Sequence, residues 1–190
     1  MIVTTDVQAG SSDTGAPPVN LTNASGLRDL DFDDLAEHRG DPACMWRSAK
    51  ADTKDWLEFD FGKPQTLIAI SFWNYNEVWH TDRGVRKMDI SIWTQQTGWR
   101  KIHEDLELDQ AEGGDGYDEP TVVKLDPTMA QKVRFDDLVS FGDTEYVGLS
   151  EVRFFGPAGP EAVNHSAPPT TQLKEFQISN FSLDFRPTAR

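Results

Sequence analysis

The sequence predicts an all-β protein that folds as an antiparallel β-sandwich. Apolar and polar residues alternate repeatedly through the middle of the chain, which is the pattern of strands with one buried face. Short clusters of Gly, Asp and Pro separate these runs, as turns do between neighbouring strands. Helical periodicity is weak, and its best example is the segment 27–38, where three leucines would give one or two helical turns. Many short strands with little helix are typical of two packed antiparallel sheets.

The alternating runs give the predicted strands in chain order. In the first run, Leu57, Phe59 and Phe61 share one face, while Glu58 and Asp60 share the other. Because successive side chains of a strand point to opposite faces, the apolar set of each run is predicted to face the core. The apolar sets of the later runs are Ile68, Ile70 and Phe72; Met88, Ile90 and Ile92; Val123 and Leu125; Val133 and Phe135; and Val152 and Phe154.

Two segments with the composition of linkers bound the predicted sandwich. Residues 1–19 are small and polar and are expected to be a linker or a flexible lead, whereas residues 20–157 carry the alternating runs. Residues 158–172 are rich in proline and read as a second linker. Residues 173–190 alternate again, so this C-terminal extension is expected to be either an extra strand of the sandwich or the start of a following domain.

The composition argues against several classes of function. The 190 residues, the size of one ordinary domain with some tail, carry a formal net charge of −14 at pH 7. This acidity argues against binding to nucleic acid or to an anionic membrane surface. No run approaches the roughly 18 apolar residues of a membrane span, and no signal peptide is predicted in the first residues. The single cysteine, Cys44, excludes an intrachain disulfide and a thiolate-clustered metal site.

Four segments occur in the order of a known family. They are RGDPACMWRSA at 39–49, WLEFDFGKPQTLIAISFWN at 56–74, GVRKMDISIWTQQTGWRKI at 84–102 and VRFDDLVSFGDTEYVGLSEVRFFG at 133–156. Together they resemble the discoidin family, also called factor V/VIII C-type or galactose-binding-like domains, and especially its bacterial carbohydrate-binding modules. The resemblance covers about residues 20–157 and implies the jelly-roll form of the β-sandwich.

The segment 73–84 lies between two predicted strands and mixes aromatic with polar side chains. An aromatic ring stacks on the apolar C–H face of a sugar, while polar side chains bind its hydroxyls. In sugar-binding relatives the ligand lies on loops at one end of the sandwich, and a second loop, 139–147, would supply another aromatic wall. The predicted ligand-binding residues are Asn76, Glu77, Trp79, His80, Arg83, Phe141 and Tyr146. The alternative is a structural loop in which Glu77 pairs with Arg83.

The resemblance also implies a test for calcium. In many members of the family a structural calcium ion is held by the first loop and by a Glu of the L-S-E segment, and Asp41 and Glu151 occupy these positions here. Arg39 and Cys44 stand where the family has an Asp and a Thr, and neither suits a hard cation. The expectation is therefore no cofactor, with Arg39 supplying the lost positive charge between Asp41 and Glu151. A calcium site rebuilt from the aspartates of 29–34 is the alternative.

These observations predict a non-catalytic carbohydrate-binding module. It would tether a larger exported or surface protein to a polysaccharide or glycan, outside the cell or in the periplasm, with the catalytic domains of the parent protein as its other partners. The chain contains no nucleophile elbow, zinc-protease motif or P-loop, and nucleic-acid binding and membrane insertion are not expected. The alternatives are a protein–protein adhesion or assembly module on the same fold and, less favoured, a small polysaccharide lyase or glycosidase.

Overall fold

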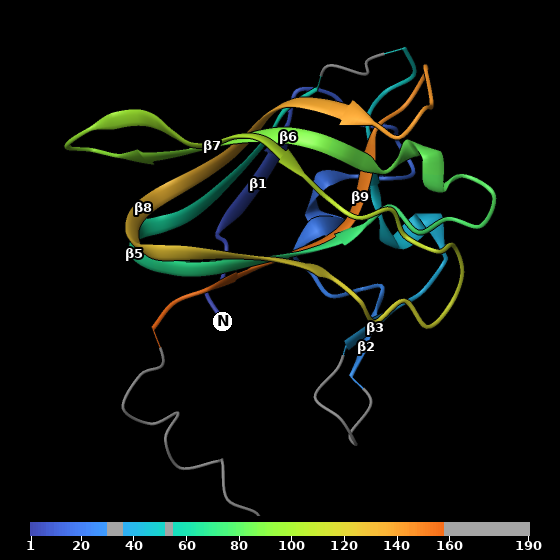
Figure 1. Ribbon diagram of the computed structural model, residues 1–190, viewed down its shortest axis with the longest axis horizontal. Coiled ribbons are helices and arrows are strands. Elements are labelled where there is room, and N and C mark those ends of the chain that lie inside the picture. Colours follow the sequence, from blue (N-terminus) through green and yellow to red (C-terminus); the bar gives the residue numbers. More distant parts are fainter. Residues whose placement is uncertain (30–35, 52–54, 158–190) are drawn as a thin grey trace, which may run out of the picture. The chain divides into compact units, whose positions relative to one another are not determined.

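The computed structural model describes residues 1–29, 36–51 and 55–157. These residues contain nine strands and three short 3₁₀ turns, connected by loops (Figure 1). In chain order they are β1 (Asp6–Ala9), η1 (Pro18–Leu21), β2 (Leu27–Asp29), β3 (Ala36–His38), η2 (Pro42–Cys44), β4 (Trp46–Arg47), β5 (Leu57–Asn74), η3 (Thr81–Arg83), β6 (Val85–Thr94), β7 (Gly98–Glu107), β8 (Thr121–Ser140) and β9 (Gly148–Phe155).

Two long strands, β5 and β8, connect the two layers of the sandwich. They pair antiparallel along most of their length and bend together, as Figure 1 shows. The register breaks between Asp60 and Gln65, and Gly62 lies in this break with a φ of +71°. A side chain is strained at such a φ, so glycine is suited to the bend. Each long strand therefore contributes one half to each layer.

The remaining strands pair with one half or the other. The first half of β5 lies beside β1, and the last half of β8 lies beside β6, which in turn pairs with β7. The last half of β5 lies beside β9, which pairs with β4. All of these pairings are antiparallel, and β2 and β3 form a separate antiparallel pair. The predicted antiparallel β-sandwich is confirmed.

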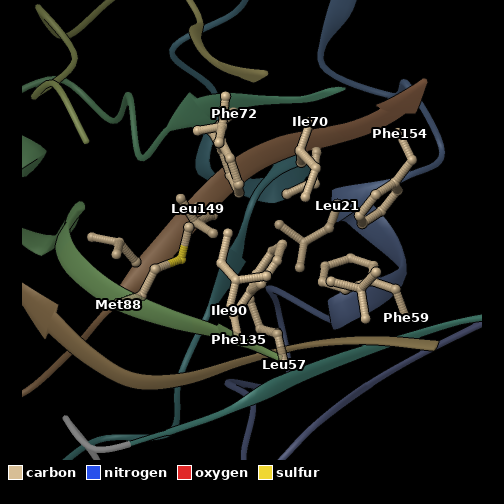
Figure 2. Close-up of a cluster of buried hydrophobic side chains, with 14 of the residues drawn as sticks. Leu21, Leu57, Phe59, Ile70, Phe72, Met88, Ile90, Phe135, Leu149 and Phe154 are labelled. Carbon is tan, nitrogen blue, oxygen red and sulfur yellow. The ribbon is translucent and has the colours of Figure 1, made fainter. Parts of the chain in front are cut away.

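The core between the layers is rich in aromatic rings. Phe135 is fully buried, with its ring centroid 4.9 Å from that of Phe59 and 5.4 Å from that of Phe72. Phe154 lies 5.1 Å from Phe59 in an edge-on arrangement. Aliphatic side chains from both layers complete this cluster, which Figure 2 shows. Tilted and edge-on rings are the favourable geometries for aromatic pairs.

Nearly all of the predicted core positions are buried, and Ile68 is an informative exception. Leu67 and Ile70 have no exposed surface, whereas Ile68 is half-buried. The pairing with β8 shifts register between Leu67 and Ala69. Such an irregularity reverses the face that each following residue presents, so strict alternation assigned Ile68 wrongly to the core.

The first residues of the chain belong to the sandwich, so the prediction of a linker over 1–19 is wrong for this segment. β1 pairs with β5 from Asp6↔Asp60 to Ala9↔Leu57. The backbone N–H of Ile2 donates to the carbonyl of Phe154 at 2.7 Å. The small and polar composition concealed this strand because β1 buries little apolar surface.

The helical interpretation of 27–38 is also wrong where the structure describes it. Both ends of that segment are strands, and Leu27 pairs with His38 across them. Residues 30–35 lie outside the described residues, as do the predicted linker 158–172 and the predicted strand or domain start at 173–190. The compact unit that contains the sandwich ends at Pro157.

We expect Phe135→Ala to lower the free energy of unfolding by about 3–5 kcal/mol, the usual loss for a fully buried phenylalanine. The reason is that Phe135 joins the rings of both layers. Urea denaturation measures the loss, and Val122→Ala is the control because Val122 is 52% exposed on the same strand. Equal effects of the two substitutions would show that the ring cluster does not hold the layers together.

Candidate functional site

Two loops lie against each other at one end of the sandwich. The loop 75–84 joins β5 to β6 and includes η3, and the loop 141–147 joins β8 to β9. Three backbone bonds connect them: Phe141 N–H donates to the Gly84 carbonyl at 3.0 Å, and the N–H groups of Gly142 and Asp143 donate to the Asp82 carbonyl at 3.1 and 3.2 Å. The topology thus brings together the two loops that the sequence predicts to form the site.

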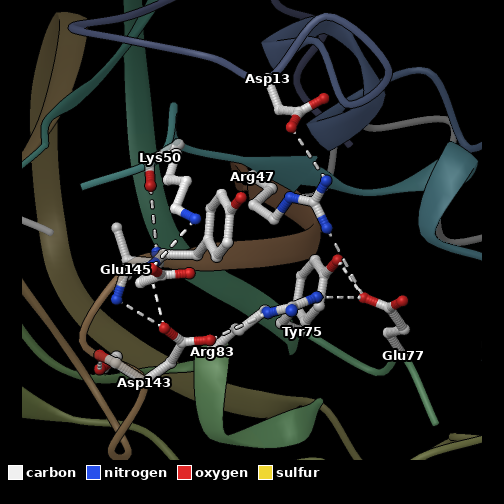
Figure 3. Close-up of polar contacts among 12 residues, drawn as sticks. Asp13, Arg47, Lys50, Tyr75, Glu77, Arg83, Asp143 and Glu145 are labelled. Atoms are coloured by element: carbon white, nitrogen blue, oxygen red, sulfur yellow. Dashed lines mark hydrogen bonds and ion pairs between the residues drawn. The ribbon is translucent and has the colours of Figure 1, made fainter. Parts of the chain in front are cut away.

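Arg83 joins the two loops through its side chain. Its Nη1 lies 2.8 Å from Oε2 of Glu77, and its Nε donates to Oδ2 of Asp143 at 3.0 Å (Figure 3). The Arg83 side chain is only 13% exposed. The pairing of Glu77 with Arg83, the alternative structural interpretation of this loop, is therefore present. Arg83 is held as a brace with little freedom to move.

A second arginine adds to this network. Arg47, which ends β4, lies 3.0 Å from Asp13 and 3.9 Å from Oε2 of Glu77. The guanidinium carbons of Arg47 and Arg83 lie 4.8 and 5.0 Å from the centre of the Tyr146 ring, within cation–π range. Tyr146 is thus a packing partner for both arginines.

The ionisation of the network favours permanent charges. Burial disfavours a charged Asp143, but the N–H of Glu145, the Arg83 guanidinium and the N–H of Tyr146 together hold the pKa of that carboxyl below its usual value. Burial, and then the hydrogen bond to Glu77, raise the pKa of Tyr75 well above its usual value. The protonated Tyr75 hydroxyl donates to Oε2 of Glu77 at 2.7 Å. Oε2 therefore accepts from both Tyr75 and Arg83.

Asn76 has a different position from the one that sequence reasoning gave it. It has no exposed surface. Its Oδ1 accepts from Gly113 N–H at 3.0 Å, and its Nδ2 donates to the carbonyls of His38 and Gly114. Asn76 therefore ties the loop 75–84 to the loop that carries Gly113, and it does not reach the surface with Trp79.

Trp79 is the most exposed large apolar side chain of the site, with 92% of its surface accessible. Its φ is +69°, a region that non-glycine residues seldom adopt and that costs about 1–3 kcal/mol. The turn around it is fixed because His80 N–H donates to the Glu77 carbonyl at 3.0 Å and Arg83 N–H donates to the His80 carbonyl at 3.1 Å. A rigid, strained backbone thus presents the indole to solvent.

The other predicted site residues differ in accessibility. His80, next to Trp79, and Phe141, at the start of the second loop, are both half-buried.

Sequence reasoning missed Arg47 and Asp13 altogether. No local signal could have found them, because they join the site through contacts with residues far away in the chain.

The residues at the calcium position of the family do not fit that ion. Asp41 is exposed and accepts from Ala43 N–H at 3.0 Å as the cap of η2. Glu151 is only 2% exposed, and burial raises its pKa to about 8 in spite of Arg153 and the Ala24 N–H. Calcium requires about six to eight oxygen ligands. Within the described parts of the chain, no three His, Cys, Asp or Glu side chains gather as a metal site would require.

The expected bridge by Arg39 between Asp41 and Glu151 is not formed. Nη2 of Arg39 donates instead to the carbonyl of Ser25 at 3.1 Å. Ser25 follows Ala24, whose N–H bonds to Glu151. The Arg39 guanidinium thus contacts the segment at Ala24 and Ser25, which also bonds to Glu151. Among the described residues, Arg39 forms no ion pair with Asp41 or Glu151.

Comparison with known proteins supports the same fold. The sequence profile of the F5/8 type C domain matches residues 10–152. A comparison with curated proteins finds no match. None of the helical segments in the described ranges is long and apolar enough to span a membrane.

Solved structures with the same fold include carbohydrate-binding modules. A pectin-binding module has 14% identity and a TM-score of 0.57, with 84% of this chain and 95% of that chain covered. A fucose-binding module of Streptococcus pneumoniae has 14% identity and a TM-score of 0.55, with 83% and 97% covered. A module of Clostridium perfringens, solved with GalNAc-β-1,3-galactose, has 10% identity and a TM-score of 0.53, with 80% and 94% covered.

These structural likenesses show the fold, and the profile match extends over most of the sandwich. The strand order, the four sequence segments and the match over residues 10–152 lead to one assignment. The chain belongs to the F5/8 type C, or discoidin, domain family.

Proposed function

We propose that this protein is a non-catalytic carbohydrate-binding module with a sugar-binding surface centred on Trp79. The observation that carries the proposal is the 92% exposed indole on a strained backbone. Strained residues gather at functional sites, and an exposed aromatic ring offers a surface on which a sugar can stack. The similar structures include a pectin-binding module, a fucose-binding module and a module in complex with GalNAc-β-1,3-galactose, which supports a sugar as the partner of this ring.

The neighbours of Trp79 provide the polar half of this surface. Oε2 of Glu77 is occupied by Tyr75 and Arg83, so Oε1 is the oxygen that accepts from a sugar hydroxyl. His80 follows Trp79 in the chain and is half-buried, and we expect its ring to bind a second hydroxyl. Arg83 and Tyr146 position these groups and do not themselves need to touch the sugar. A sugar ring stacked on the indole would then be oriented by two hydrogen bonds.

The ionisation of the loops supports binding without catalysis. A glycosidase needs a carboxylic acid with a raised pKa beside a second carboxylate. Two carboxylates of these loops, those of Glu77 and Asp143, are paired with Arg83, and the pKa of Asp143 is lowered. A group held in the charged form cannot donate a proton to a leaving group.

The shallow form of the surface suits a tether. A single sugar on one exposed ring buries little area, so we expect weak binding per site. Several such modules in one parent protein would retain it on a polysaccharide through multivalency. We infer a place in a larger exported or surface protein, in which other domains perform any catalysis.

We expect Trp79→Ala to weaken glycan binding by about tenfold or more, because it removes the stacking surface. Affinity electrophoresis against a panel of neutral polysaccharides measures the loss. Stability should stay within about 0.5 kcal/mol because the ring packs against almost nothing. Trp99→Ala is the control, since Trp99 is 42% exposed on β7, away from these loops. Binding that survives Trp79→Ala would move the sugar site elsewhere, and no binding at all would favour a protein partner.

We also infer that binding needs no calcium, since no three His, Cys, Asp or Glu side chains of the described residues gather as a metal site would require. Addition of EDTA or of millimolar calcium should leave both the glycan affinity and the melting temperature unchanged. Differential scanning calorimetry with and without calcium checks the second quantity. A rise in melting temperature that depends on calcium would overturn the inference.

The pH dependence of stability provides a separate check. Protonated Glu151 stabilises the fold fully below pH 4.5, and this contribution is lost as the pH rises towards its folded pKa of about 8. His38, whose pKa burial lowers to about 4, acts in the opposite sense between pH 4 and 6.5. The two trends oppose each other between pH 4.5 and 6.5, so the free energy of unfolding should fall mainly from pH 6.5 to 8.

The slope of that fall should be up to about 1.4 kcal/mol per pH unit. Urea denaturation at pH 6.5, 7.2 and 8 measures it, and Glu151→Gln should abolish it because the amide does not titrate. A decline of the same size in Glu151→Gln would assign the slope to another group.

A further inference from the structure

A long groove lies away from the Trp79 loops, along the open side of the sandwich. Its wider part has a volume of about 570 Å³ and lies between the β6–β7 hairpin tip and the bend of β5 and β8. A second part of about 410 Å³ continues between β7 and the first half of β8. Arg100 and Thr128 line both parts, so the two are neighbours. β6 begins beside the site loops at Val85 and ends at this hairpin, so the wider part lies at the opposite end from Trp79 (Figure 1).

The groove follows two sheet edges. Among the described residues, β7 pairs only with β6, and residues 121–130 of β8 pair only with β5. The other edge of each of these two strands has no strand partner in the described part of the chain, and both strands line the groove. An extended occupant that runs along the strands fits such a shape.

The lining combines apolar and polar groups that suit sugar rings. Met129 is 51% exposed, and Ile92, Pro64 and Pro127 lie in the same part of the groove. Polar side chains from the hairpin surround this apolar floor; they are Thr94, Gln95, Gln96 and Thr97. Amide and hydroxyl groups above an apolar floor match the hydroxyls and C–H faces of a saccharide.

The charge of the groove is opposite to that of the whole chain. Arg100 and Lys124 are exposed cations, and neither has a carboxylate within ion-pair distance in the described ranges. Lys101 is already paired with Asp89, and Asp126 is the one carboxylate among the residues that line the two parts. The protein as a whole carries −14 charges. Two unpaired cations in one groove therefore indicate an anionic ligand.

The contrast with the Trp79 loops strengthens this point. Both arginines there are engaged by carboxylates: Arg47 by Asp13, and Arg83 by Glu77 and Asp143. Their charge is neutralised within the protein, so that surface suits a neutral sugar. Arg100 and Lys124 in the groove have no such carboxylate partner among the described residues.

We propose that this groove is a second glycan-binding site and that it takes an acidic polysaccharide. Carboxylate or sulfate groups of the polymer pair with Arg100 and Lys124, and the sugar rings lie on the floor at Met129. The site is separate from the surface at Trp79 and stands whether or not that surface binds sugar.

The test compares polygalacturonate with its fully methyl-esterified form, which has the same sugars without the charge. Wild-type protein and Trp79→Ala should both bind polygalacturonate, with an affinity that decreases as salt increases. Arg100→Gln combined with Lys124→Gln should weaken this binding about tenfold. The esterified polymer should bind less than polygalacturonate, and it should bind equally to the wild-type protein and to the double variant. Arg28→Gln, a change at an exposed arginine on the separate β2–β3 sheet, is the charge control and should have little effect.

Several results would overturn the proposal. One is wild-type affinity for polygalacturonate in the double variant, and another is the same loss in Arg28→Gln. Loss of polygalacturonate binding in Trp79→Ala alone would place the acidic polymer at the loops. Equal binding of poly-L-glutamate would assign the groove to acidic peptides. Self-association of the double variant with unchanged polygalacturonate binding would show that the cations protect the sheet edges from other chains.

Discussion

The antiparallel pairing of β5 with β8 is the constraint on which the rest of the fold depends. Both strands bend at one place and pass from one layer to the other, so a single ladder of hydrogen bonds sets the position of both sheets. Every other strand of the sandwich attaches directly or through one neighbour to this pair. The phenylalanine cluster then fills the space that the bend encloses. The ends of the same two strands also start the loops 75–84 and 141–147, so the bend places both loops at one end.

Within those loops, the charged side chains pair with one another and hold the loops in position, so few of their charges are left to bind a ligand. Arg83 holds the two loops together, because its guanidinium pairs with one carboxylate in each of them. Removing Arg83 would leave the largely buried Asp143 carboxylate without its ion-pair partner, which is costly. Asn76 connects the loop 75–84 to the loop that carries Gly113 through hydrogen bonds between uncharged groups. The groups that remain accessible are few, and the exposed indole is supported by a network that a ligand need not disturb.

The sequence was sufficient for the fold and for the location of the site, but not for the role of each residue in it. Alternation identified most core positions because burial on one face leaves a direct pattern in the chain. It failed at Ile68, where an irregular register reverses the faces, and at β1, which buries too little to leave a pattern. The loop 75–84 was recognisable from its composition. The division of its polar residues into buried braces and accessible groups depends on partners such as Asp143 and Gly113, and only the folded chain brings these together.

The bond between Ile2 and Phe154 has a mechanical consequence. It places the first residues of the unit beside the end of its last strand, so the chain enters and leaves the sandwich at neighbouring points. β9 starts at Gly148 beside the site loops and runs away from them, so these points lie far from Trp79. Tension between the two ends would act first on the Ile2–Phe154 bond and, after it opens, on the pairing of β1 and β9 with β5. A module pulled at both ends would therefore lose the bond between Ile2 and Phe154 before the loops at Trp79 were disturbed.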